Sequence, residues 1–138
     1  KISYQGVQYD KTDISGMEFL HIDAWTADLN QLKTFLIREP GNANPREVAV
    51  VKDLKKDEWT SLDIPLSEWT SQGITLGDLF QFKFEGVDQW AQADVFLDNI
   101  YFWKANSVGL PIYFDKHMLL DYKSLGLRNH VYKLKLIH

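Results

Sequence analysis

Three residues that can stack on a ligand or hydrogen-bond it follow one another at a spacing of two: His21, Asp23 and Trp25. Aliphatic residues are interleaved with them, so in an extended strand these three side chains share one face. An indole is a flat apolar plate, and a carboxylate and an imidazole beside it can hydrogen-bond hydroxyl groups. A pyranose ring, with its apolar C–H faces and rim of hydroxyls, fits such a set. The alternative is that Trp25 covers the core at a strand end and the other two pack beneath a loop.

Two other segments supply further candidates for the same face. Gln81 and Lys83 alternate with phenylalanines, and we expect them to extend the face on a neighbouring strand. Phe35 and Ile37 also alternate with inward residues and are expected to add an apolar floor. An indole between polar loop residues has no obvious core to fill, so Trp90 is a rival site. The expected ligand-binding residues are Trp25, His21, Asp23, Trp90, Gln81 and Lys83.

The remaining tryptophans are expected to pack rather than bind. Trp59 opens a predicted strand and is expected to cover a sheet edge, and Trp69 follows a turn and is expected to fill the core. Trp103 shares the alternation of Val95 and Leu97, which predicts that it packs on the same side as they do.

No catalytic constellation is visible in the chain. A glycosidase needs two carboxylates roughly 5–10 Å apart across a cleft, whereas the acidic residues here lie mostly in predicted turns, where they are usually solvated. Gly-x-Ser-x-Gly, a phosphate-binding loop and His-Glu-x-x-His are all missing from the sequence. We therefore expect that the chain is not an enzyme.

Composition excludes several other classes. The net charge is −4 and no basic cluster occurs, which argues against a nucleic-acid partner. Cysteine is absent, which excludes disulfides and thiolate metal sites. No apolar run approaches the roughly 20 residues that span a bilayer, so no membrane partner is expected. Five Trp are more than a small core needs, so some are expected to face a ligand.

Most of the chain has an apolar period of two, with turn residues every 8–12 positions, as in an all-β antiparallel β-sandwich. We expect the jelly-roll type, with residues 67–73 as a loop or one helical turn. The predicted strands cover residues 5–9, 18–26, 32–38, 47–52, 59–64, 79–84 and 95–104.

Residues 105–138 break this rhythm, so residues 1–104 are taken as the domain and the rest as a tail. Within the tail, residues 109–111 resemble a linker, residues 115–127 could form a helix and residues 131–137 alternate like a strand. A strand that completes the sheet, the start of another domain and a foreign segment are equally open readings. We expect the chain to be a piece of a longer protein.

Five stretches of the chain resemble the β-sandwich carbohydrate-binding modules of bacterial laminarinases and related family 16 glycoside hydrolases. They occur in the order found in that family and near its spacings. The resemblance covers residues 4–104 and lacks the family's opening strand and any counterpart of the tail. It implies a secreted or cell-surface bacterial protein in which this module binds polysaccharide, with β-glucan as the substrate class, beside an attached catalytic domain. The stretches are YQGVQ (4–8), DISGM (13–17), LHIDAWT (20–26), WTSLDIPLS (59–67) and FLDNIYF (96–102).

The same resemblance gives a possible role to Asp98. Asp and Asn are poor strand formers, yet Asp98 and Asn99 lie inside an apolar strand. In jelly-roll sugar-binding modules an Asp of the final strand commonly ligates a structural calcium, so Asp98 is the candidate metal ligand and is expected near the end of the sandwich. The alternative is a carboxylate that accepts hydrogen bonds from backbone amides.

Two functions thus remain for the chain. The first is a non-catalytic polysaccharide-binding module, in which Trp25→Ala should abolish glycan binding without unfolding the protein. The second is a structural spacer or adhesin-like sandwich that does not touch sugar. Exposed tryptophans would favour the first, and burial of all five would favour the second.

Overall fold

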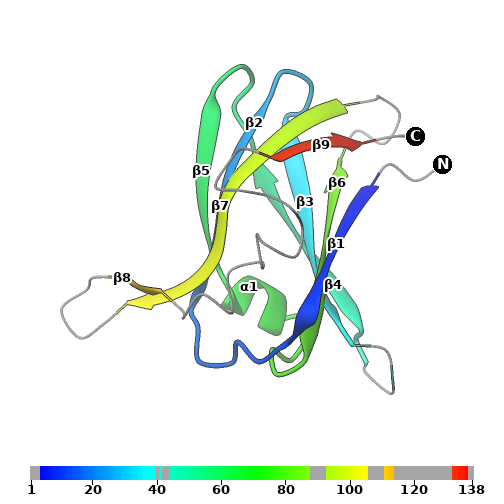
Figure 1. Ribbon diagram of the computed structural model, residues 1–138, viewed down its shortest axis with the longest axis vertical. Helices are drawn as coiled ribbons and strands as arrows, with labels where there is room; N and C mark the ends of the chain where they lie inside the picture. Colours follow the sequence, from blue (N-terminus) through cyan, green and yellow to red (C-terminus); the bar gives the residue numbers. More distant parts are fainter. Residues whose placement is uncertain are drawn as a thin grey trace.

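The computed structural model describes residues 4–39, 41, 44–87 and 93–105, together with the backbone of Pro111–Tyr113 and Tyr132–Leu136. In this part of the chain two antiparallel sheets pack face to face, and each of the seven predicted strands forms (Figure 1). The prediction of an all-β sandwich is therefore confirmed. The period of two explains this result, because strands such as β2 and β6 bury alternate residues against the other sheet.

The first sheet has the strand order β1-β6-β3-β4, and every neighbouring pair in it is antiparallel. Phe82 and Phe84 point from β6 into the core, so Gln81 and Lys83, which alternate with them, lie on the outer side of this sheet. Its strands are β1 (Tyr4–Thr12), β6 (Leu79–Gly86), β3 (Gln31–Arg38) and β4 (Glu47–Asp53).

The second sheet has the order β5-β2-β7-β8, and a further strand, β9, also pairs with β7. The long strand β7 is paired with β2 along one edge. Its other edge pairs with β9 near the start of β7 and with β8 near its end. The strands are β5 (Trp59–Pro65), β2 (Phe19–Thr26), β7 (Ala93–Ala105), β8 (Pro111–Tyr113) and β9 (Tyr132–Leu136).

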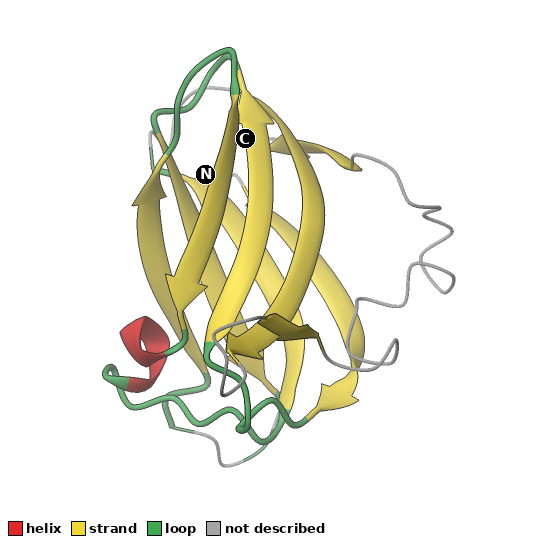
Figure 2. Cartoon of the chain, turned by 90° about the vertical axis from the view of Figure 1, so that its left-hand side faces the viewer, coloured by secondary structure: helices red, strands yellow, loops and turns green. Residues whose placement is uncertain are grey.

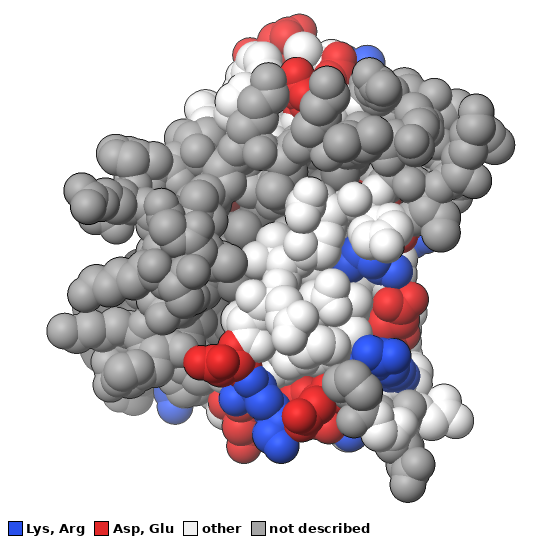
Figure 3. Space-filling view, turned by 45° about the vertical axis from the view of Figure 1, so that its right-hand side comes forward, with Lys and Arg blue, Asp and Glu red and all other residues white. Residues whose placement is uncertain are grey.

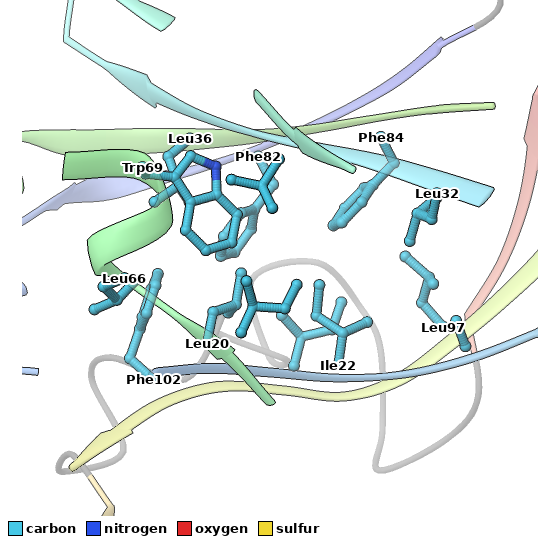
Figure 4. Packing of buried hydrophobic residues seen from close by; sticks show 14 of the residues in the cluster. Leu20, Ile22, Leu32, Leu36, Leu66, Trp69, Phe82, Phe84, Leu97 and Phe102 are labelled. Carbon is cyan, nitrogen blue, oxygen red and sulfur yellow. The ribbon is translucent and has the colours of Figure 1, made fainter. Parts of the chain in front are cut away.

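The core fills the space between the two sheets with aliphatic and phenylalanine side chains (Figure 4). Trp69 is fully buried there, and its Nε1 donates a hydrogen bond to the backbone oxygen of Thr34 at 3.1 Å. The predicted core position of Trp69 is thus confirmed. A buried indole needs such a partner, because an unsatisfied N–H in the core is costly.

Trp69 is carried by α1 (Ser67–Thr70), the short helical turn expected within residues 67–73. This turn lies at one end of the sandwich, where it closes the space between the sheets (Figures 1 and 2). No helix in the described part of the chain is long and apolar enough to cross a membrane.

Part of the tail also joins the fold. The strand β9 falls within the predicted strand at residues 131–137 and extends the second sheet through its pairing with β7. The helix expected at residues 115–127 lies outside the described residues.

Candidate functional site

The outer face of the β5–β2–β7 sheet carries the residues singled out first in the sequence. The aliphatic residues Leu20, Ile22 and Ala24 of β2 are completely buried, so the interleaved side chains project away from the core. Below, "outer face" denotes Trp59, Ser61 and Asp63 of β5, Phe19, His21, Asp23 and Trp25 of β2, and Phe96, Asp98, Asn99, Tyr101 and Trp103 of β7.

One end of the outer face is aromatic. Trp25 is the direct cross-strand partner of Trp59 on one side and of Phe96 on the other. The Trp25 and Phe96 rings meet edge to face with centroids 5.6 Å apart, and Trp25 is half-buried. Trp59 instead is 46% exposed, and no described ring packs against it. Of the indoles that the structure describes, the one expected to cover a sheet edge is therefore the most exposed to a ligand.

The middle of the outer face is a hydrogen-bonded network that spans three strands. His21 Nδ1 lies 2.8 Å from Asp63 Oδ1 and its Nε2 lies 3.1 Å from Asp23 Oδ1. The imidazole stacks on the Tyr101 ring with centroids 4.7 Å apart. Trp103 Nε1 donates to Asp63 Oδ1 at 2.9 Å. Because these partners come from β5, β2 and β7, the network fixes the three strands relative to one another.

Asp23 lies at the centre of this network, and donors surround both of its oxygens. Ser61 Oγ donates to Oδ1 at 2.6 Å and Asn99 Nδ2 donates to Oδ2 at 2.7 Å. Partial burial alone would raise the pKa of Asp23, but the hydrogen bonds from Asn99 and Ser61 and the neighbouring His21 outweigh it and hold the pKa below its ordinary value. Asp23 is therefore an ionised structural carboxylate.

A β-bulge in β7 places two successive polar residues on the outer face. His21 is paired with Tyr101 and Asp23 with Asp98, so β7 has one residue more than β2 between these pairs. Asn99 takes up the extra length in a left-handed conformation with φ of 49°. Such a conformation is uncommon for residues other than Gly, and Asn is among those that tolerate it best.

The bulge also overturns one expectation about β7. Trp103 was expected to share a face with Val95 and Leu97, because all three have odd numbers in an alternating strand. The structure buries Val95 and Leu97 in the core and places Trp103 on the outer face, where its ring stacks on Phe19 at 4.5 Å. The extra residue shifts the alternation, so the C-terminal half of β7 faces the opposite way from the simple pattern.

Gln81 and Lys83 do not extend the outer face, so that expectation is wrong. They lie in β6 of the other sheet, on the opposite side of the sandwich, because β6 pairs with β1 and β3 rather than with β2. Lys83 Nζ lies 3.7 Å from the Phe35 ring centroid and 3.1 Å from Glu47. Phe35 and Ile37 accompany them on β3 and likewise add nothing to the outer face. In Figure 3, which brings the β1 side forward, basic and acidic side chains lie side by side along the lower and right-hand margins of an uncharged area.

Asp98 was expected near the end of the sandwich, but it lies midway along β7, opposite Asp23. Its Oδ1 accepts a hydrogen bond from the backbone amide of Asn99 at 2.8 Å, as in the alternative reading. Calcium takes 6–8 oxygens, and among the described residues no group of three or more His, Cys, Asp or Glu side chains is placed to hold a metal ion. The calcium site at Asp98 therefore stays a prediction, which melting curves in calcium and in chelator test.

The rival loop site at Trp90 lies outside the described residues, as does its whole loop at positions 88–92. The candidate site that the structure does describe is thus confined to the outer face.

Three residues of the site on β5 were not among the ligand-binding residues predicted from the sequence. Trp59, Ser61 and Asp63 are all exposed on β5. Their signal was present, because they alternate with Thr60, Leu62 and Ile64, of which Ile64 is buried in the core. What the sequence could not show is that β5 pairs with β2, which brings them beside His21 and Trp25.

No family model matches the chain, and neither a curated protein nor a solved structure is significantly similar to it.

Proposed function

We propose that the chain is a non-catalytic polysaccharide-binding module and that the outer face of the β5–β2–β7 sheet is its binding surface. The resemblance of residues 4–104 to modules of laminarinases supports a β-glucan as the polysaccharide. In the full-length protein the module would hold an attached glycoside hydrolase at its substrate, outside a bacterial cell.

The observation that carries this proposal is the exposed indole of Trp59 beside Trp25. An aromatic side chain stabilises a protein mainly when it is removed from water. Trp59 is 46% exposed, so part of this stabilisation is obtained only when a binding partner covers the indole. Ser61 and Asp63 follow Trp59 on the same face of the same strand. An apolar plate, followed along the same strand by a hydroxyl and then a carboxylate, suits a chain of sugar rings.

The same network argues against a glycosidase. The general acid of such an enzyme needs a raised pKa, so that it is protonated near neutral pH. The pKa of Asp23 is lowered, and both of its oxygens already accept hydrogen bonds. Asp63 and Asp23 contact the two nitrogens of one imidazole, so His21 occupies the space between them. The pair supports binding rather than bond cleavage.

Affinity electrophoresis through gels that contain laminarin, mixed-linkage glucan, xylan or a marine galactan tests the proposal. We expect retardation in at least one β-glucan gel, and its loss in Trp59→Ala. Tyr4→Ala is the matched control, because Tyr4 is 49% exposed but belongs to the other sheet. Unretarded migration in all four gels would favour the structural spacer. Loss of binding in Tyr4→Ala alone would move the site to the other sheet.

A further inference from the structure

Asp63 differs from Asp23 in how its two oxygens are used. Asp63 Oδ1 accepts a hydrogen bond from Trp103 Nε1 at 2.9 Å and lies 2.8 Å from His21 Nδ1. For Asp63 Oδ2 no partner is found in the described part of the chain, and the side chain is 48% exposed. At Asp23, by contrast, both oxygens accept from neighbouring side chains.

From this difference we infer that Asp63 is the specificity-determining acceptor of the outer face and that its Oδ2 binds a hydroxyl of a neutral glycan. The inference rests on the proposed function. One oxygen is held by contacts with side chains of two other strands, Trp103 of β7 and His21 of β2, so the second oxygen has a defined direction before any ligand arrives. Such a preorganised group loses little conformational entropy on binding.

The position of Asp63 relative to Trp59 agrees with a chain-like ligand. The two residues lie four positions apart on β5 and project to the same side. At the rise of a strand this separates them by about 13 Å. A glycan that runs along β5 would stack on Trp59, pass the exposed Ser61 and reach Asp63 with a later sugar unit.

The charge of this region limits the ligand further. A carboxylate accepts hydrogen bonds from hydroxyl groups but repels carboxylates and sulfates. Asp23, two residues before Trp25 in the next strand, carries a second carboxylate, and its pKa is lowered by hydrogen bonds from Asn99 and Ser61. A neutral polysaccharide is therefore favoured at this position over a uronate-containing or sulfated one.

Asp63→Asn separates the ligand role from the structural role. An Asn side chain can keep its carbonyl oxygen in the place of Oδ1, and so retain the bond from Trp103, while it puts an uncharged donor in the place of Oδ2. We expect the affinity for laminarin to fall about tenfold or more, the usual worth of a hydrogen bond to a charged group, with little change in melting temperature. Asp53→Asn is the matched control, because Asp53 is an exposed carboxylate in β4 of the other sheet and likewise accepts a side-chain hydrogen bond, from Gln31 Nε2 at 2.7 Å. For this variant we expect less than a threefold change in the affinity for laminarin.

Carboxymethylated laminarin provides the second measurement. At low ionic strength, where charge repulsion is least screened, the wild-type protein should bind it at least tenfold more weakly than laminarin, and Asp63→Asn should narrow this gap. Wild-type laminarin affinity in Asp63→Asn, or equal binding of both polymers by the wild type, would overturn the inference and leave the proposed function standing. Failure of the wild type to bind laminarin, mixed-linkage glucan, xylan and galactan alike would instead overturn both.

Discussion

Trp25 and Trp59 are direct cross-strand partners on the outer face, yet Trp59 is 46% exposed while Trp25 is half-buried against Phe96. The difference follows from their strands. β2 lies between two neighbours, whereas β5 is the last strand of its sheet and has one. We therefore expect that Trp59, rather than Trp25, is the main residue on which a sugar ring stacks.

Trp59→Ala is expected to weaken glycan binding about thirtyfold or more, because truncation of an aromatic anchor commonly costs at least about 2 kcal/mol. Its effect on stability should be small, within about 0.5 kcal/mol, as for surface substitutions that disturb no packing. Isothermal titration with laminarin and urea denaturation measure the two quantities.

Trp25→Ala should lose both binding and stability, since it also removes the contact with Phe96. Equal binding by Trp59→Ala and the wild type, with loss only in Trp25→Ala, would return the stacking role to Trp25. If the urea midpoint of Trp25→Ala also stayed unchanged, the sequence-based prediction that this variant loses binding without loss of stability would be correct.

Trp69→Ala should destabilise the protein by about 3–5 kcal/mol, the usual cost of removing a fully buried large aromatic side chain. The cavity would open between α1 and the strands, and Thr34 would lose its donor. Trp69→Phe should destabilise the protein less, because it keeps most of the ring volume and loses little more than the hydrogen bond to Thr34. Denaturation midpoints in urea compare the two, and a loss below about 1 kcal/mol for Trp69→Ala would contradict the packing described above.

The stability of the sandwich should fall in acid partly through Asp23. Its pKa in the folded protein lies below the ordinary 3.8, so the ionised carboxylate stabilises the folded state. That contribution is complete above the unfolded pKa and is lost as the pH falls through the lower, folded pKa. In thermal melts between pH 3 and pH 7, the melting temperature of the wild type should exceed that of Asp23→Asn at neutral pH, and this difference should narrow toward pH 3. A gap that stays constant with pH would mean that the charge of Asp23 contributes nothing.

Asn99→Val should be less stable than Asn99→Gly, by about 1–3 kcal/mol, although valine is the better strand former. Asn99 has φ of 49°, which glycine adopts without strain and a β-branched residue does not. Both variants lose the bond to Asp23, so their difference isolates the backbone. The reverse order of stability in urea would show that the bulge is absent.

The alternation of apolar residues was enough to predict the seven strands and the outward direction of His21 and Trp25, because burial of one strand face is a local property. It could not predict strand neighbours, which depend on pairing over long sequence distances. Lys83 illustrates this limit, since it points outward as expected but from the other sheet. Trp103 illustrates a second limit, because a single bulge reverses the side of the sheet to which each later residue of the strand points.

The bulge in β7 also determines which changes in chain length this surface would tolerate. Deletion of Asn99 would restore plain alternation, so Tyr101 and Trp103 would still point outward and Phe102 would still fill the core. Deletion of the next residue, Ile100, would bring the amide of Asn99 to a position that is now 3% exposed. Two deletions one position apart would thus have opposite consequences, and a homologue one residue shorter here could keep the same aromatic surface.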